Sequence, residues 1–256
     1  MDARDRLERA AAEVIVIMKG IPELADASVA VIGGLALWKY IRNGRTTQDV
    51  DFIINIDSAP QSVKSKLLAL PDSPFVQQAQ LFLYKDSQGH YIQIDITPAW
   101  QSPYLPAAAK KLRTIPAGSV PYISPIDLLI FKMNSCGLRA QVAKRSVDAN
   151  DAEMLIAAMG TPLNLTAQQQ ELVEPRIADV VSFGSKTEEW WRQNLGLPAK
   201  GPSADDYWTW SEEYQNWYHL NDDGTYEWAS QGDSSSAGPS QKPKKSSKSS
   251  GKGKRR

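Results

Sequence analysis

The chain has 256 residues, of which 42% are hydrophobic and 23% are charged, a composition typical of a globular protein with one or two domains. Its single cysteine, Cys136, excludes an internal disulfide framework, and one cysteine with two histidines argues against a structural zinc site. The N-terminus is charged from Asp2 onward, and no stretch approaches the roughly 18 apolar residues of a membrane span. We therefore expect no membrane partner and an intracellular protein, either cytoplasmic or nuclear.

The formal net charge of zero hides an asymmetry between the two ends of the chain. Eight of the 29 basic residues lie after position 240, where there is no acid, which leaves 21 basic and 29 acidic residues in the rest. The body of the protein is therefore acidic and its C-terminal tail is strongly basic.

Four elements are predicted in the first 56 residues. Apolar residues recur at helical spacing in the first twenty positions, which predicts an amphipathic helix. The apolar, β-branched stretch 27–33 predicts a buried strand that ends at a glycine pair. A helix is expected to open right after the glycines, over residues 35–42, and the alternation within residues 49–56 predicts a second strand.

A helix and a hairpin are predicted next. Residues 62–70 favour a helix that stops near Pro71. Residues 79–85 and 90–97 are predicted strands, and the turn signal DSQG between them is typical of a hairpin with a short loop. The stretch VPYIS, residues 120–124, predicts another short strand.

Helical patterns dominate the region that follows. One helix is predicted to begin with Ser124 as its N-cap and Pro125 in its first position. A second is predicted to begin at Ser146, with acids in its first turn, and to stop at Gly160, and two more are expected within residues 167–194. Mixed strands and helices followed by helices alone predict an α/β (α+β) fold, with a short mixed sheet flanked by helices and then a helical region.

The chain changes character near Pro198. Residues 198–229 are acidic and aromatic-rich, with four Trp among the 21 residues of 208–228. Their acidity argues against stacking on nucleic-acid bases, because it would repel a phosphate backbone; packing back onto the domain, or docking a basic partner, is favoured. Residues 230–256 are too poor in apolar residues to form a core, so we expect a disordered basic tail.

The basic tail is open to four interpretations. It fits a nuclear import signal bound by an import receptor, a tether to nucleic acid, or a solvating end. An intramolecular contact with the acidic segment 198–229 is the fourth. The composition favours none of the four over the others.

Two carboxylates stand at the head of the second predicted strand. Because strand side chains alternate, Asp49 and Asp51 point to the same face, with their backbones about 6.5–7 Å apart. Asp95 is a third acid inside an apolar strand, with Gln93 on its face. If the two strands are neighbours, three carboxylates meet at one end of the sheet, where Mg²⁺ finds the oxygen ligands it prefers. Two such ions would stabilise the attacking and leaving oxygens of an in-line displacement.

Gly33 and Gly34 complement these acids. Without side chains, their backbone can approach a phosphate closely, and the helix that follows would offer free N–H groups and its positive dipole end. A phosphate-binding backbone and metal-binding acids within about twenty residues form a more specific signal than either alone.

The stretch GGLALWKYIRNGRTTQDVDFII resembles the nucleotidyltransferase signature of the DNA polymerase β-like superfamily: a glycine pair, a helix, then acid–apolar–acid on a strand. It is most similar to the AbiEii-type, or minimal nucleotidyltransferase, branch through GGLAL followed by Arg45, Thr47, Asp49 and Asp51 at alternate positions. The later stretch DLLIFKMNSCGLRAQVAKRSVDANDAEML adds the candidates Lys132, Arg139 and Asp148 or Asp151. The resemblance covers roughly residues 1–160 and is absent beyond.

The resemblance implies a nucleotidyltransferase core over residues 1–120, with a helical region over 121–197 packed on it. It also implies transfer of a nucleoside monophosphate from an NTP to an acceptor hydroxyl, on an RNA end or a protein, with Mg²⁺ as cofactor. In that reaction Asp49 and Asp51 would hold the metals, and Asp95 would complete the second metal site and help to deprotonate the acceptor. The nucleotide would be bound by Gly33, Gly34, Arg45, Thr47 and Lys132.

Each of these assignments has a structural alternative. The superfamily usually has Ser or Thr directly after the glycine pair, where this chain has Leu35, so a catalytically inactive scaffold on the same fold is the rival hypothesis. Arg45 and Thr47 could brace their loop, and Lys132 could be a solvated helix lysine. Arg139, Lys144 and Arg145 could form a surface cluster, and His90 and His219 have no partner at metal-binding spacing.

Overall fold

The computed structural model describes residues 2–41, 44–200, 207–221 and 223–229. The described residues belong to two compact units, one within residues 1–198 and one beyond residue 198. The predicted disordered tail, residues 230–256, lies outside the described residues. Within the described part of the chain, no helix is both long enough and apolar enough to cross a membrane.

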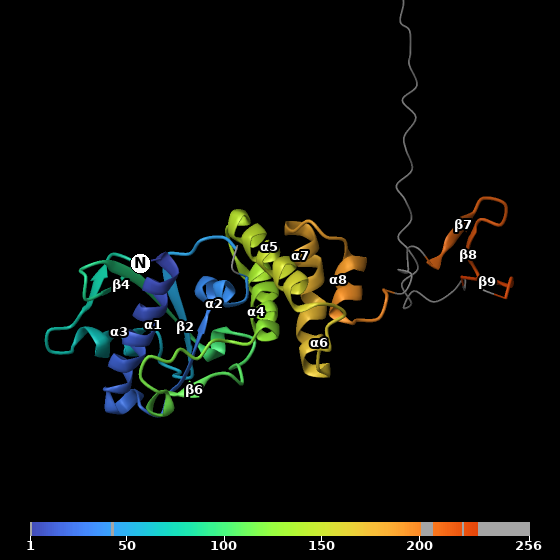
Figure 1. Ribbon diagram of the computed structural model, residues 1–256. Coiled ribbons are helices and arrows are strands. Elements are labelled where there is room, and N and C mark those ends of the chain that lie inside the picture. Colours follow the sequence, from blue (N-terminus) through green and yellow to red (C-terminus); the bar gives the residue numbers. More distant parts are fainter. Residues whose placement is uncertain (1, 42–43, 201–206, 222, 230–256) are drawn as a thin grey trace, which may run out of the picture. The chain divides into compact units, whose positions relative to one another are not determined.

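The first unit combines a six-stranded mixed sheet with helices that flank and follow it (Figure 1). Its helices and strands, in chain order, are α1 (Ala3–Lys19), β1 (Ser28–Ile32), α2 (Gly33–Tyr40), β2 (Asp49–Ile54), α3 (Gln61–Leu68), β3 (Phe75–Gln78), β4 (Leu81–Lys85), β5 (Tyr91–Pro98), β6 (Lys110–Lys111), α4 (Pro125–Leu138), α5 (Val142–Met159), α6 (Ala167–Val173), α7 (Ile177–Phe183) and α8 (Glu188–Leu195). The α/β class predicted from the sequence, a mixed sheet flanked by helices and followed by a helical region, is confirmed.

The strands are ordered β3-β4-β5-β2-β1-β6 across the sheet. The central neighbours β2 and β5 run parallel, and every other pair of neighbours is antiparallel. The predicted hairpin is present as β4 and β5. In the parallel pair, Asp51 lies directly opposite Asp95, so the topology brings together two acids that are far apart in the sequence.

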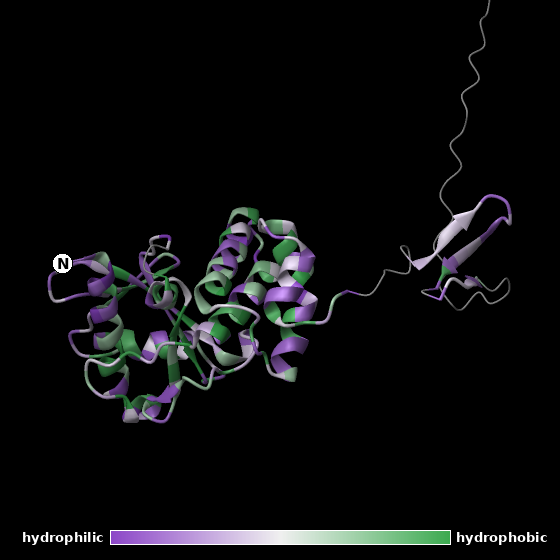
Figure 2. Ribbon diagram, turned by 45° about the vertical axis from the view of Figure 1, so that its right-hand side comes forward, coloured by the Kyte–Doolittle hydropathy of each residue, from purple (hydrophilic) through white to green (hydrophobic). Residues whose placement is uncertain are grey.

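Alternate side chains of the central strands contribute to two separate hydrophobic cores, and the strands appear as hydrophobic ribbons between the helices in Figure 2. On β2, Val50 and Phe52 belong to the core with α1 and α3, whereas Ile53 belongs to the core with α4 and α5. Strand alternation puts Asp49 and Asp51 on the same side as Ile53. The two acids therefore face the helical region.

The helix α4, which forms one wall of that region, begins where the sequence predicted. The Ser124 hydroxyl accepts a hydrogen bond from the Asp127 N–H, as expected of an N-cap. The predicted start of α5 is wrong, because this helix begins at Val142 and not at Ser146. The intervening Ala-Lys-Arg is a run of good helix formers that extends the helix by one turn, and the helix ends before Gly160 as predicted.

The remaining differences concern short elements. Strands β3 and β6 were not predicted, because both are short edge strands with polar residues. Residues 120–124 form no strand; Tyr122 makes a single bridge to Val31. Three α-helices, α6, α7 and α8, occupy the region where two were predicted, and the helix expected after the glycines begins at Gly33 itself.

The second unit contains a three-stranded antiparallel sheet in the order β7-β8-β9 (Figure 1). Its strands are β7 (Thr209–Ser211), β8 (Asn216–Leu220) and β9 (Tyr226–Trp228). None of its described residues is fully buried. No strand was predicted here, because the aromatic residues alternate with acids and turn residues over very short distances.

Candidate functional site

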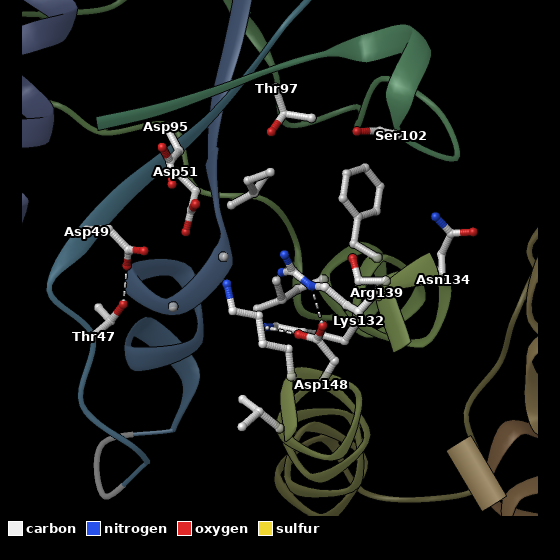
Figure 3. Close-up of a pocket in the computed structure, with 18 of the residues that line it drawn as sticks. Thr47, Asp49, Asp51, Asp95, Thr97, Ser102, Lys132, Asn134, Arg139 and Asp148 are labelled. Atoms are coloured by element: carbon white, nitrogen blue, oxygen red, sulfur yellow. Dashed lines mark hydrogen bonds and ion pairs between the residues drawn. The ribbon is translucent and has the colours of Figure 1, made fainter. Parts of the chain in front are cut away.

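Three carboxylates, Asp49, Asp51 and Asp95, form the centre of the site, and they are called the triad below. One oxygen from each lies within 4.8 Å of the other two. Figure 3 shows the three side chains next to one another on β2 and β5. Among the residues that the structure describes, this is the one cluster of three or more His, Cys, Asp or Glu side chains that could hold a metal ion.

Each carboxylate of the triad accepts a hydrogen bond from a neutral donor. The donors are the Thr47 hydroxyl for Asp49, the Gly34 backbone N–H for Asp51 and, at 2.9 Å, the Gln93 Nε2 for Asp95. None of the ion pairs formed among the described residues includes a member of the triad. The described residues therefore orient the three negative charges without neutralising them.

The crowding of negative charge changes the acidity of the central member. Burial, and to a smaller extent the neighbouring charges of Asp49 and Asp95, raise the pKa of Asp51 to about 7. The charge of Lys132 and the N–H of Gly34 act in the opposite direction. Near neutral pH, Asp51 is therefore protonated for part of the time, and a divalent cation would be able to replace that proton.

Both glycines make room for side chains of the site. Gly33 has a φ of +68°, and a Cβ atom there would collide with the carboxylate of Asp51. A Cβ atom on Gly34 would collide with the Thr47 hydroxyl. Leu35 points away from this contact into the core, where 1% of its surface is exposed.

A second group of charges, here called the charge cluster, lies on α4, α5 and the loop before β2. The Lys132 Nζ is 2.9 Å from Asp148 Oδ1 and 2.8 Å from Asp151 Oδ2, and all three residues are buried. The Arg45 Nη2 is 3.1 Å from Asp151 Oδ2, and the Arg139 Nε is 3.0 Å from Asp148 Oδ2. Three cations thus neutralise two buried carboxylates.

The triad and the charge cluster face each other across a cavity of about 950 Å³. In Figure 3 the triad lies on one side and Lys132, Arg139 and Asp148 lie opposite. All eight residues predicted from the sequence line this cavity; they are Gly33, Gly34, Arg45, Thr47, Asp49, Asp51, Asp95 and Lys132. Their roles in binding or chemistry stay predictions.

Residues other than the eight predicted ones also line the cavity. Lys144 lines the cavity with Arg139, whereas Arg145 lies over the ring of Phe183. Thr97 also lines the cavity, on the same face as the triad. The polar residues that alternate with isoleucines on β5 were the available signal for Thr97 and for the orienting role of Gln93.

The two histidines lie in local contacts. The His90 Nδ1 is 3.2 Å from Asp86 Oδ2, and the His219 Nδ1 is 2.8 Å from the carbonyl oxygen of Tyr207. Cys136 is fully buried on α4, as expected of a small core residue.

No family model matches this chain, and no curated protein does. Among solved structures, an antigenic nucleotidyltransferase-like protein from Paracoccidioides brasiliensis is 20% identical, with a TM-score of 0.46 over 72% of this chain and 95% of that chain. The antibiotic-resistance factor ANT(2'')-Ia is 13% identical, with a TM-score of 0.38 over 70% of this chain and 95% of that chain. With TM-scores this low, neither likeness identifies the activity.

Proposed function

We propose that the protein is a Mg²⁺-dependent nucleotidyltransferase that moves a nucleoside monophosphate from an NTP to an acceptor hydroxyl. The observation that carries the proposal is the triad: three uncompensated carboxylates with oxygens within 4.8 Å of one another, beside a large cavity. The sequence resemblance around residues 31–54 supports the proposal, because Asp49 and Asp51 occupy the acid–apolar–acid positions of that signature.

The triad fits Mg²⁺ on chemical grounds. Mg²⁺ prefers carboxylate and phosphate oxygens and keeps few protein ligands. Burial, and then the charges of Asp49 and Asp95, raise the pKa of Asp51, so a cation beside this carboxylate would stabilise its charged form. Asp49, Asp51 and Asp95 would together hold two Mg²⁺ ions. When bound, Mg²⁺ would polarise the reacting phosphoryl group and neutralise the charge that develops on it.

The protein's own residues would position the reactants. The backbone of Gly33 and Gly34, at the start of α2, would approach the phosphates of the NTP. Asp95 would accept the proton of the acceptor hydroxyl. The hydroxyl oxygen would form a bond to the α-phosphorus of the NTP, while the bond from the α-phosphorus to the pyrophosphate oxygen breaks.

The charge cluster would present a cationic wall to the triphosphate. Lys132 is fixed by two carboxylates, so its position does not depend on the substrate. Arg139, with 48% of its side chain exposed, and Lys144 line the same cavity nearer the solvent. The acceptor, an RNA end or a protein hydroxyl, would enter on the side of Asp95.

A second candidate is a catalytically inactive protein on the same fold that acts as a scaffold. Two observations favour it. Leu35 is buried and offers no hydroxyl, and the charges of Lys132 and Arg45 are already satisfied by Asp148 and Asp151.

Incubation of the purified protein with each labelled NTP, Mg²⁺, and either total cellular RNA or total protein separates the two candidates. We expect one acceptor pool to become labelled, and expect Asp49→Asn with Asp51→Asn to reduce labelling on the order of 10³-fold, because several kcal/mol of charge stabilisation is lost. The matched control is Asp57→Asn, an exposed acid in the same unit, which should leave labelling unchanged. Mg²⁺-dependent NTP binding without labelling would favour the scaffold, and labelling or binding that survives loss of both acids would exclude the proposed site.

A further inference from the structure

The three-stranded sheet of the second unit carries far more aromatic surface than it can bury. The exposed fractions are 39% for Trp210, 63% for Tyr214, 59% for Tyr226 and 39% for Trp228. Among the described residues of this unit, none is fully buried, so the sheet carries no packed layer of their side chains. Exposed aromatic surface of this kind is typical of an interaction site.

One face of this sheet forms a continuous platform of rings. The register places Tyr218 opposite Trp228, and Tyr226 lies two residues before Trp228 on the same face. The Trp228 ring centroid is 5.5 Å from Tyr218, 5.0 Å from Tyr214 and 6.5 Å from Tyr226. These four residues are called the aromatic face below.

The opposite face is already engaged within the sheet. Trp210 packs edge-on against Trp217 at 5.3 Å, and Tyr207 stacks on His219 at 3.6 Å. The Tyr207 hydroxyl also donates to Glu227. The aromatic face is therefore the better candidate for a ligand from outside the sheet.

The charge around the sheet selects the kind of ligand. Residues 201–240 contain eight acids and no Lys or Arg, whereas residues 241–256 contain eight Lys or Arg and no acid. Glu212 and Glu213 are exposed in the turn that leads to Tyr214. Lysine and arginine side chains bind over Trp and Tyr rings through cation–π attraction, which adds to the attraction between opposite charges.

We propose that the aromatic face binds the chain's own basic tail, residues 241–256, in an intramolecular contact. The distance along the chain permits this, because 13 residues separate Trp228 from Lys242, and a linker of that length spans roughly 20 Å on average. The five-residue strand β8 is only about 17 Å long. A short tether also gives the tail a millimolar local concentration at the sheet, which favours its own sheet over that of a second copy.

The test uses full-length chains and a fluorescent peptide with the sequence of residues 240–256. The receptor is the whole protein with its tail cations replaced by Gln: Lys242→Gln, Lys244→Gln, Lys245→Gln, Lys248→Gln, Lys252→Gln, Lys254→Gln, Arg255→Gln and Arg256→Gln. We expect the peptide to bind this receptor, to lose affinity about tenfold when salt rises from low to several hundred millimolar, and to bind the unmodified protein at least about tenfold more weakly, because the tail there occupies the site.

Two ring deletions in that receptor locate the contact. Trp228→Ala should weaken peptide binding about tenfold, whereas Trp210→Ala, which removes a ring of the same 39% exposure on the opposite face, should not. Tyr214→Ser and Tyr226→Ser, at the two most exposed rings, provide the same comparison if Trp228→Ala unfolds the sheet.

Five results would overturn the proposal. Failure of the peptide to bind, or equal binding by a peptide with Gln at all eight cationic positions, would remove the charge recognition. Equal loss with Trp210→Ala would remove the aromatic face as the site. Equal affinity for the unmodified protein would show that the tail does not occupy the site, and tail-dependent dimers at low salt would assign the tail to a second copy.

Discussion

The two walls of the cavity hold carboxylates in opposite electrostatic states. On one wall, the triad places three acids together with neutral donors only. On the other, Asp148 and Asp151 are surrounded by Lys132, Arg45 and Arg139. The comparison separates acids that form ion pairs with cations of the protein from acids that form none among the described residues, and only the second kind is available to hold a metal.

The charge cluster still affects the acidity of the triad. Lys132 forms no ion pair with the triad, yet its charge opposes the rise in the pKa of Asp51. A buried ammonium fixed by two carboxylates has one position, so its effect on the triad, and on any phosphate in the cavity, is constant. The charge cluster is therefore best understood as the support that fixes a cation.

The largest expected effect on stability follows from removing Lys132 from the charge cluster. Lys132→Met leaves Asp148 and Asp151 buried beside only their arginine partners, and we expect a loss of about 3–5 kcal/mol in the free energy of unfolding. Denaturant unfolding measures it. The control is Lys66→Met, which breaks an exposed pair with Glu23 at 2.9 Å and should lower the free energy of unfolding far less, because solvent screens the pair. If both variants lost the same free energy of unfolding, the buried ion pairs of Lys132 would be no more important for stability than an exposed pair.

The next largest effect concerns the triad and is a change of the free energy of unfolding with pH. Because the pKa of Asp51 is raised to about 7 from its usual 3.8, the folded protein binds a proton that the unfolded chain releases. The stability this provides is complete below about pH 4 and is lost as the pH rises through 7. Between pH 5 and pH 8, the metal-free protein should lose roughly 2.5 kcal/mol of unfolding free energy from this group.

Asp51→Asn provides the reference for that measurement. It should remove this part of the pH dependence, and millimolar Mg²⁺ should restore stability to the unmodified protein at pH 8 by binding the folded state. If both proteins lost the same unfolding free energy between pH 5 and pH 8, the triad would not be the source.

A smaller effect separates backbone strain from contact with the triad. Gly33 and Gly118 have φ angles of +68° and +76°, but only a Cβ on Gly33 would meet Asp51, whereas a Cβ on Gly118 meets nothing within 4 Å. Gly118→Ala should lower the free energy of unfolding by about 1 kcal/mol, and Gly33→Ala should lower it by about 2 kcal/mol more. Gly33→Ala should also bind Mg²⁺ more weakly, as measured by calorimetry. Unaltered Mg²⁺ affinity in Gly33→Ala would show that the close contact does not position the acid.

The smallest effect concerns the orientation of one carboxylate. Thr47→Val keeps the shape of the buried side chain but removes the hydroxyl that donates to Asp49, so we expect a loss of about 1 kcal/mol and a few-fold weaker affinity for Mg²⁺. Thr46→Val, at the exposed neighbouring position, should change neither quantity. A Thr47→Val protein with full Mg²⁺ affinity would leave the hydroxyl with no role at the site.

Elements with a strong local signal were predicted well. The Ser124 cap, the hairpin of β4 and β5, and the strand that carries Asp49 and Asp51 each follow from residues adjacent in the chain. The start of α5 was misplaced at Ser146, because a good cap residue followed by acids also occurs inside a helix when the preceding residues favour helix formation. The edge strands β3 and β6 carry little apolar alternation and therefore gave no signal.

The sequence by itself determined that Asp49 and Asp51 share a face, that a glycine pair precedes them, and that acidic and basic charge are segregated toward the C-terminus. Only the tertiary structure decided that Asp95 lies opposite Asp51, that Lys132 is bound by Asp148 and Asp151, and that Gly33 is needed to admit a carboxylate of the triad. The physical reason is range. Alternation, capping and turn chemistry act between neighbours in the chain, whereas strand pairing and buried ion pairs depend on which elements pack together.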